Sequence, residues 1–338
     1  MEDFHNLLDM HTEACESVRT LKITAGRWDK AGLVDLESLG RMANRFRNLK
    51  SVHLIRLTWT IDETREYHQF ASPSVKCLTI SGNRTFDPTF STDTLFSIFH
   101  IFPHATSLDL KDHVCSMRSQ TGFPPDHHLE SLVLRDALLF ALITQRIRQT
   151  SRHSLKSLVV HQPFNLHLAG LGELLEQVGS NLEHFGLDIG MIRATEPADH
   201  IWEVLRLSSC TSLRSFCVIY VPLLDTADVS PRVQQGPAII TLLLQAPPTL
   251  QEITLIMRLP SPLERELAER DLNSWDWEKL VDLLHRFRLL KVVRFKEEEK
   301  SAPSQFRQTE QQLIRDRMNT CIRGHLSDLW ELGKLRFS

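Results

Sequence analysis

A short pattern of apolar and polar positions returns along the whole chain: an apolar residue, two variable ones, an apolar one, one variable one and an apolar one. Eleven segments follow it, and their starts are 24 to 42 residues apart. They are VRTLKI from Val18, LKSVHL from Leu49, VKCLTI from Val75, ATSLDL from Ala105, LESLVL from Leu129, LKSLVV from Leu155, LEHFGL from Leu182, LRSFCV from Leu213, LQEITL from Leu250, LKVVRF from Leu290 and LGKLRF from Leu332. Nine of the eleven second positions are Lys, Arg, Glu or Gln, and five third positions are Ser, which chance does not produce. Because side chains alternate across a strand, each segment predicts a strand with its fourth and sixth positions buried.

The stretches between these segments carry apolar residues at the 3.6-residue spacing of a helix. Leu33, Leu36, Leu39, Met42 and Phe46 share one helical face, and further helices are expected at 95–102, 138–147, 171–178, 201–207, 239–244 and 280–287. A single strand and helix of this size cannot bury both apolar faces, so stacked copies are needed to complete a core. The sequence therefore predicts an α/β solenoid of strand-loop-helix units.

The eleven segments resemble the L-x-x-L-x-L consensus of leucine-rich repeats, and the resemblance covers the chain from Val18 to Phe337. It implies a horseshoe-shaped solenoid of about eleven repeats, with a parallel concave sheet and a helical outer face. The repeats are irregular, widen in length along the chain and contain strands such as LKSL. In these respects they resemble the substrate-recognition part of fungal and other eukaryotic F-box proteins, which act as ubiquitin-ligase receptors. No F-box is recognisable before Val18, so we expect the cullin adaptor not to bind.

We expect residues 1–338 to form one solenoid domain with capped ends. Residues 1–16 are predicted to form an N-terminal capping helix, 17–308 to hold the repeats, and 309–338 to form a long helix and the last strand as a C-terminal cap. Insertions rich in proline, glycine or charge are expected at 222–237, 258–274 and 296–305. The apolar stripe of the C-terminal helix is predicted to pack as a cap, with a partner helix as the alternative: Leu313, Ile314, Met318, Cys321, Ile322, Leu326, Leu329 and Trp330.

The composition mainly argues against certain classes of protein and partner. The formal net charge of −3 over 338 residues gives no global attraction to nucleic acid or to an anionic membrane. The longest apolar run, residues 238–244, is far shorter than the roughly 20 residues that cross a bilayer. The six cysteines include no C-x-x-C pair, which favours reduced thiols. We therefore expect a monomeric cytoplasmic or nuclear protein that binds neither nucleic acid nor membrane.

Motifs that would indicate catalysis or metal binding do not emerge from the sequence. GLGELL at 170–175 lacks the third glycine of a dinucleotide-binding loop. His127 and His128 have no Cys or Glu at ligand spacing. The sequence therefore predicts no catalytic residue, no cofactor and no metal.

The alternation of the strands also predicts which residues form a recognition surface. If the fourth and sixth positions are buried, the third, fifth and seventh line the concave sheet. The candidate binding residues on it are Arg135, Val159, His161, Asp188, Cys217, Ile219, Ile256, Arg294, Lys296, Lys334 and Arg336, of which the last four form a basic cluster. An apolar strip bordered by charge is typical of protein contact sites, so we expect a noncatalytic module that binds a partner protein. The alternatives are an enzyme on a closed (β/α) barrel, a small-ligand receptor using the concave face, and a sheet shielded by its own loops.

Overall fold

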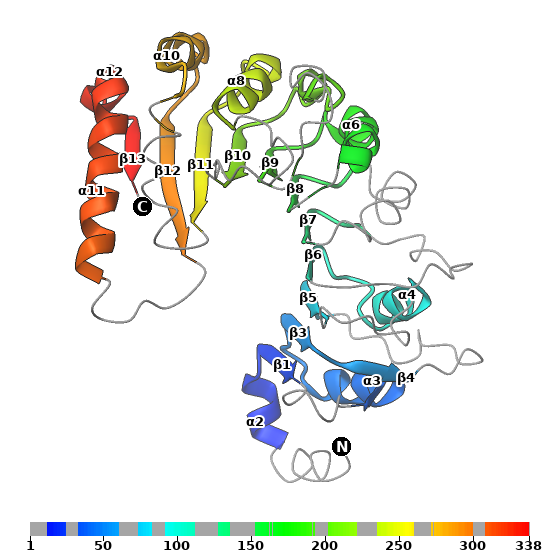
Figure 1. Cartoon of the computed structure of the whole chain (residues 1–338). Helices are drawn as coiled ribbons and strands as arrows, with labels where there is room; N and C mark the ends of the chain where they lie inside the picture. The colour runs from blue at the N-terminus through cyan, green and yellow to red at the C-terminus, as the bar shows by residue number, and fades with distance from the viewer. Residues whose placement is uncertain are drawn as a thin grey trace. The chain divides into compact units, whose positions relative to one another are not determined.

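The computed structural model describes residues 12–24, 33–60, 74–82, 92–111, 128–135, 153–161, 163, 165–190, 192, 202–221, 235–259, 272, 274–299 and 308–337. The chain forms two compact units, Met1–Leu155 and Lys156–Ser338 (Figure 1). The sequence predicts a single domain, and the division between the units falls just before a strand that begins at Ser157.

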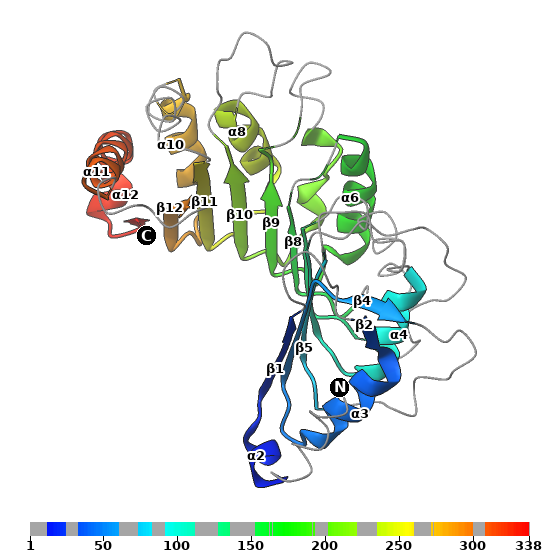
Figure 2. The ribbon, with the colours of Figure 1, turned by 60° about the horizontal axis from the view of Figure 1, so that its bottom comes forward.

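The first unit is built on a parallel sheet with the strand order β1-β3-β5-β6-β7. Its strands are β1 (Thr20–Thr24), β3 (Ser51–Ile55), β5 (Cys77–Ser81), β6 (Ser107–Lys111) and β7 (Ser131–Leu134). Its described helices are α2 (Thr12–Ser17), α3 (Leu36–Arg45) and α4 (Thr92–Ile101). Helices α3 and α4 lie on the same side of this sheet (Figure 2).

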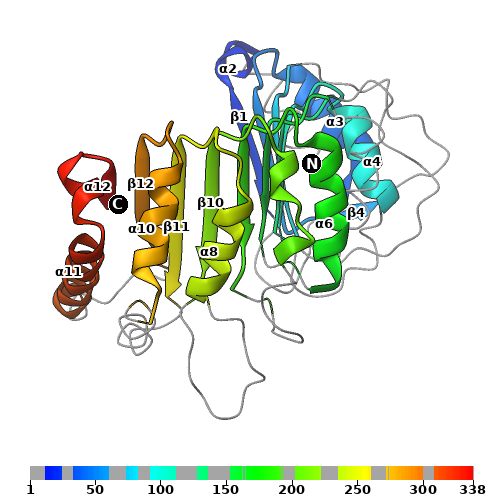
Figure 3. The ribbon, with the colours of Figure 1, turned by 90° about the horizontal axis from the view of Figure 1, so that it is seen from above.

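The second unit repeats this arrangement with the strand order β8-β9-β10-β11-β12-β13, again parallel. The strands are β8 (Ser157–Val160), β9 (His184–Asp188), β10 (Ser215–Tyr220), β11 (Glu252–Leu259), β12 (Val292–Glu299) and β13 (Leu335–Phe337). The helices are α6 (Asn165–Val178), the 3-10 helix η2 (Leu207–Ser209), α8 (Gln235–Gln245), α10 (Trp277–Arg286), α11 (Gln308–His325) and α12 (Ser327–Glu331). Helices α6, α8 and α10 cover one face of strands β8 to β12 (Figures 1 and 3).

All eleven predicted strands are present, and ten of them begin at the third position of the repeated segment. In nine of the eleven strands both the fourth and the sixth positions are buried, as Leu158 and Val160 of β8 illustrate with exposed fractions of 0% and 2%. Ile23 of β1 and Phe337 of β13, both at sixth positions, are instead half-buried. Pairs of equivalent positions face each other across neighbouring strands, such as Leu158 beside Phe185. The α/β class with parallel strands in chain order is therefore confirmed.

The expected helix containing Leu33 begins later than predicted. Leu33–Asp35 is instead strand β2, which pairs in parallel with β4 (Thr58–Thr60) in a separate two-stranded sheet. The Asp35 carboxylate accepts a hydrogen bond of 3.0 Å from the backbone N–H of Ser38, which fixes the helix start at Leu36. The expected helix at 138–147 lies outside the described residues.

The ends of the chain and the insertions agree only in part with the expectations from the sequence. Helix α2 covers the last residues of the predicted N-terminal cap, and α11, α12 and β13 form the C-terminal part. Within the expected C-terminal stripe, Met318, Ile322, Leu326 and Leu329 are buried, whereas Trp330 is 44% exposed. Residues 222–234, 260–271 and 300–305 of the expected insertions lie outside the described residues. Strand β11 continues to Leu259 and β12 to Glu299, into positions where insertions were expected.

The two glycines of GLGELL have different roles within α6. A Cβ on Gly172 would lie 1.8 Å from the backbone carbonyl oxygen of Val204, whereas a Cβ on Gly170 would meet nothing within 4 Å. Gly172 therefore allows α6 to approach the backbone before η2.

We expect Gly172→Ala to destabilise the fold by about 1–3 kcal/mol, because the backbone of Val204 or of α6 must shift. The matched Gly170→Ala variant should stabilise it by about 0.5–1 kcal/mol, since alanine loses less backbone entropy in a helix. Urea denaturation of both variants measures the difference. Equal free energies of unfolding for the two variants would contradict the close approach.

Candidate functional site

The face of the second sheet opposite α6, α8 and α10, called the open face below, carries the third, fifth and seventh positions of each repeat. The strand register aligns the fifth positions into a row of Val159, Gly186, Cys217, Thr254, Arg294 and Arg336. The seventh positions Asp188, Ile219, Ile256 and Lys296 form a second row. Ten of the eleven candidate binding residues lie in this unit and contribute to its open face.

The apolar part of this face is only partly covered. Val159, Cys217 and Ile256 are half-buried, whereas Ile219 is 3% exposed. Val159 leans over the neighbouring strand, where a Cβ on Gly186 would lie 3.0 Å from its Cγ1. The face therefore offers a short strip of partly exposed aliphatic and thiol groups, rather than the full apolar strip that alternation alone predicts.

A buried group of charged side chains lies beside this strip. Asp188 is completely buried, and its Oδ2 accepts a hydrogen bond of 2.5 Å from Nη1 of the buried Arg258. The Nε of Arg258 donates to Oε2 of Glu298 at 2.8 Å. The Oδ1 of Asp188 accepts from the backbone N–H of Gly190 at 3.0 Å, and Nδ1 of His161 lies 3.9 Å from Oδ2. Arg258 thus bridges strands β9, β11 and β12.

Two members of this group, Arg258 and Glu298, were not among the candidate residues. Both occupy ninth positions, because β11 and β12 are eight residues long and continue past the seventh position. The period-two alternation of Ile256 with Arg258 and of Lys296 with Glu298 was the signal that could have placed them. The charge-rich composition of these stretches favoured inserted loops instead.

Burial and the attraction between opposite charges shift the pKa values of Asp188 and Arg258. Burial raises the pKa of Asp188 above its usual range, although Arg258 and the N–H of Gly190 pull in the opposite direction. Burial alone would lower the pKa of Arg258, but Asp188 and Glu298 raise it overall. The guanidinium therefore stays charged, and it is the group that allows a carboxylate to persist at this buried place.

The thiol of Cys217 is poorly suited to nucleophilic chemistry. Burial raises its pKa to about 11, a shift that Lys296 only partly opposes. A thiol with such a pKa is protonated at neutral pH and is a weak nucleophile. Cys217 therefore contributes to the face as a small apolar side chain.

The basic cluster predicted at the C-terminal end separates into paired and unpaired charges. Nη1 of Arg294 donates to Oε2 of Glu252 at 2.9 Å. Lys296 and Arg336 are exposed and Lys334 is half-buried; none of these three has a carboxylate within ion-pair distance among the described residues. The available positive charge thus comes from these three residues.

Arg135 belongs to the first unit, in contrast to the other candidates. Its Nε lies 3.4 Å from Oδ1 of Asp109, whose Oδ2 lies 3.1 Å from Nζ of Lys111. These side chains form their own charged group at the fifth and seventh positions of β6 and just after β7.

No protein-family model matches this chain, and no curated protein matches it. Within the described ranges, no helix is long and apolar enough to cross a membrane. The same part of the chain holds no cluster of three or more His, Cys, Asp or Glu side chains that would bind a metal ion.

Proposed function

We propose that the protein is a noncatalytic leucine-rich-repeat module that binds a partner protein through the open face of its second unit. The observation that carries the proposal is the strip of Val159, Cys217 and Ile256, half-buried on a sheet face that α6, α8 and α10 do not cover. Partly exposed apolar groups beside charged ones are typical of protein contact surfaces.

The charges beside the strip indicate the chemistry of the partner. Lys296 and Arg336 lie on the same face, beyond the apolar residues and towards the last strand. A partner segment with apolar side chains followed by acidic ones would match both parts of the face. We therefore propose an acidic, partly apolar protein segment as the bound element.

The similarity of the strand repeats to F-box receptors supports a more specific role. In that role the chain is the substrate-recognition part of an F-box-type ubiquitin-ligase receptor, and the acidic segment belongs to the substrate. The open strand order argues against the closed-barrel alternative, because β13 pairs with β12 alone among the described residues and a barrel would pair both of its edges.

We expect Val159→Glu combined with Ile256→Glu to reduce recovery of the captured partner at least tenfold, because two carboxylates replace apolar contacts and repel acidic side chains. The measurement is quantitative mass spectrometry after affinity capture with the full chain from cells that express it. Leu244→Glu combined with Leu289→Glu is the matched control, since these leucines are 44% and 53% exposed and lie outside the strands, on α8 and on the turn after α10.

Circular dichroism and thermal melting establish that each variant is folded. Lys296→Glu provides a second variant with an exposed side chain, and it should weaken capture with a smaller effect. Undiminished capture by folded open-face variants, or equal loss with the leucine control, would contradict the proposal.

A further inference from the structure

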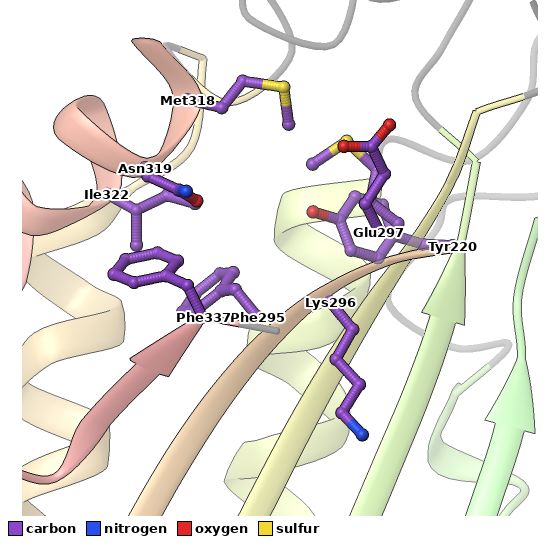
Figure 4. A pocket seen from close by; sticks show the side chains of 9 residues that line it. Tyr220, Phe295, Lys296, Glu297, Met318, Asn319, Ile322 and Phe337 are labelled. Atoms are coloured by element: carbon purple, nitrogen blue, oxygen red, sulfur yellow. The ribbon is translucent and has the colours of Figure 1, made fainter. Parts of the chain in front are cut away.

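The second unit contains a cavity of about 200 Å³ where strands β10, β11 and β12 continue beyond the sixth position of their repeats. The strand register places their eighth positions side by side, Tyr220 beside Met257 and Met257 beside Glu297. Three side chains of helix α11 face this row: Met318, Asn319 and Ile322 (Figure 4). Because eighth positions point to the same side as the fourth and sixth, the cavity lies on the side of the sheet opposite the open face.

Packed aromatic rings hold the mainly apolar wall of the cavity in place. Phe295 and Phe337 form one end of it, with ring centroids 6.2 Å apart, and the Phe337 ring also contacts Trp330 at 6.2 Å. At the other end, Tyr220 packs against Trp275 with ring centroids 5.6 Å apart. The cavity is therefore already formed in the protein without a ligand.

The polar groups at the cavity do not favour a charged ligand. Tyr220 and Glu297 both take part in other interactions within the protein. The ammonium of Lys296 points away from the cavity, and Asn319 contributes an uncharged amide (Figure 4). A charged ligand would therefore lose its hydration without finding, among the lining residues, a side chain of opposite charge that is available to it.

We infer that this cavity binds a small uncharged aromatic molecule with a single ring. An engineered apolar cavity of about 150 Å³ in another protein holds benzene, so about 200 Å³ accommodates one ring with a short substituent. The two phenylalanine rings and the thioethers of Met257 and Met318 offer favourable contacts to such a ring. This site is separate from the open face, and the inference does not rest on the proposed protein binding.

The first test measures binding of three probes of similar size to the full chain by isothermal titration calorimetry at pH 7. We expect toluene to bind with a Kd of about 0.5 mM, which is within the range for a ligand of about seven heavy atoms. Benzylamine carries a positive charge at this pH and benzoate a negative one, so each should bind at least tenfold more weakly than toluene. Equal binding of the three probes, or no binding of toluene, would overturn the inference.

Spectra of protein carrying ¹³C-methyl methionine locate the bound ring. Toluene should shift the methyl signals of Met257 and Met318, because both side chains line the cavity. Met42 is the matched control: it is 2% exposed in helix α3 of the first unit, so its signal should stay in place. Binding without a shift of either cavity methionine would place the ligand elsewhere and contradict the inference.

Two tryptophan variants on helix α11 test the space itself. Asn319→Trp should fill the cavity and weaken toluene binding at least tenfold, because the indole takes the place of the ligand. Thr320→Trp puts the same ring at an exposed position of α11 and should leave the Kd unchanged. Thermal melting establishes that each variant is folded, and toluene binding that survives in folded Asn319→Trp would refute the site. If Asn319→Trp does not fold, the methionine spectra of the unmodified chain decide. These measurements involve no captured partner, so ring binding and partner capture can fail independently.

Discussion

Replacing Arg258 by methionine is expected to destabilise the protein by about 3–5 kcal/mol at pH 7. The substitution leaves the fully buried Asp188 without the guanidinium that lies 2.5 Å from its Oδ2. The hydrogen bond from Gly190 and the imidazole of His161, 3.9 Å away, compensate only a fraction of that loss. Urea denaturation measures the change in the free energy of unfolding.

Asp188→Asn in the same background is the matched control. It removes the buried charge and retains an oxygen that can accept from the N–H of Gly190, so the double variant should recover at least about 2 kcal/mol. A loss below about 1 kcal/mol for Arg258→Met, or no recovery in the double variant, would contradict the ion pair as the element that holds this buried carboxylate.

The destabilisation should also depend on pH. Burial raises the pKa of Asp188 in the folded state above its ordinary value of 3.8, so this carboxyl stabilises the fold when protonated, and that contribution is lost as the pH rises through the folded pKa. Arg258 lowers the pKa of Asp188, so the loss of Arg258 moves this pKa further upwards. The difference between wild type and Arg258→Met should therefore be larger at pH 7 than at pH 5, and the Asp188→Asn background should abolish this dependence.

Leu158→Asp is expected to abolish cooperative unfolding of the second unit, with a loss above about 4 kcal/mol. Leu158 is completely buried in β8 and faces Phe185 of β9, which stacks on Phe216 at 5.8 Å. A carboxylate at this place would be buried among apolar side chains and would remove apolar contacts at the same time. Thermal melting and limited proteolysis measure the effect.

Val159→Ser in the next position is the control, because its side chain is half-buried on the open face. It should lose less than about 1.5 kcal/mol and keep a cooperative melt. A soluble Leu158→Asp variant with a wild-type melting curve would contradict the assignment of fourth positions to the core.

The strands could be predicted from sequence because their signal is local. An apolar residue at every second position is enough to place Leu158 and Val160 in the core, and the repetition removes the ambiguity of any single segment. The two-stranded β2-β4 sheet escaped prediction because its three-residue strands lie outside the repeated segments and are too short to display a period of their own, although Trp59 within it is 3% exposed.

The open face could be predicted only in outline. Alternation assigns His161, Asp188 and Ile219 to that face, but all three are buried, with exposed fractions of 8%, 0% and 3%. Alternation tells which way a side chain points and not what covers it. The guanidinium of Arg258 reaches Asp188 from two strands away, a contact between residues 70 positions apart that depends on strand register and order.

Site-specific photocrosslinking tests the proposed recognition by the open face most directly. A benzophenone amino acid at Ile256, half-buried on the open face, is compared with one at Leu244, which is 44% exposed on helix α8. We predict that the captured partner becomes covalently attached at position 256 and not at position 244. Crosslinking at 244 alone, or at neither position while the partner is still captured, would contradict recognition through this face.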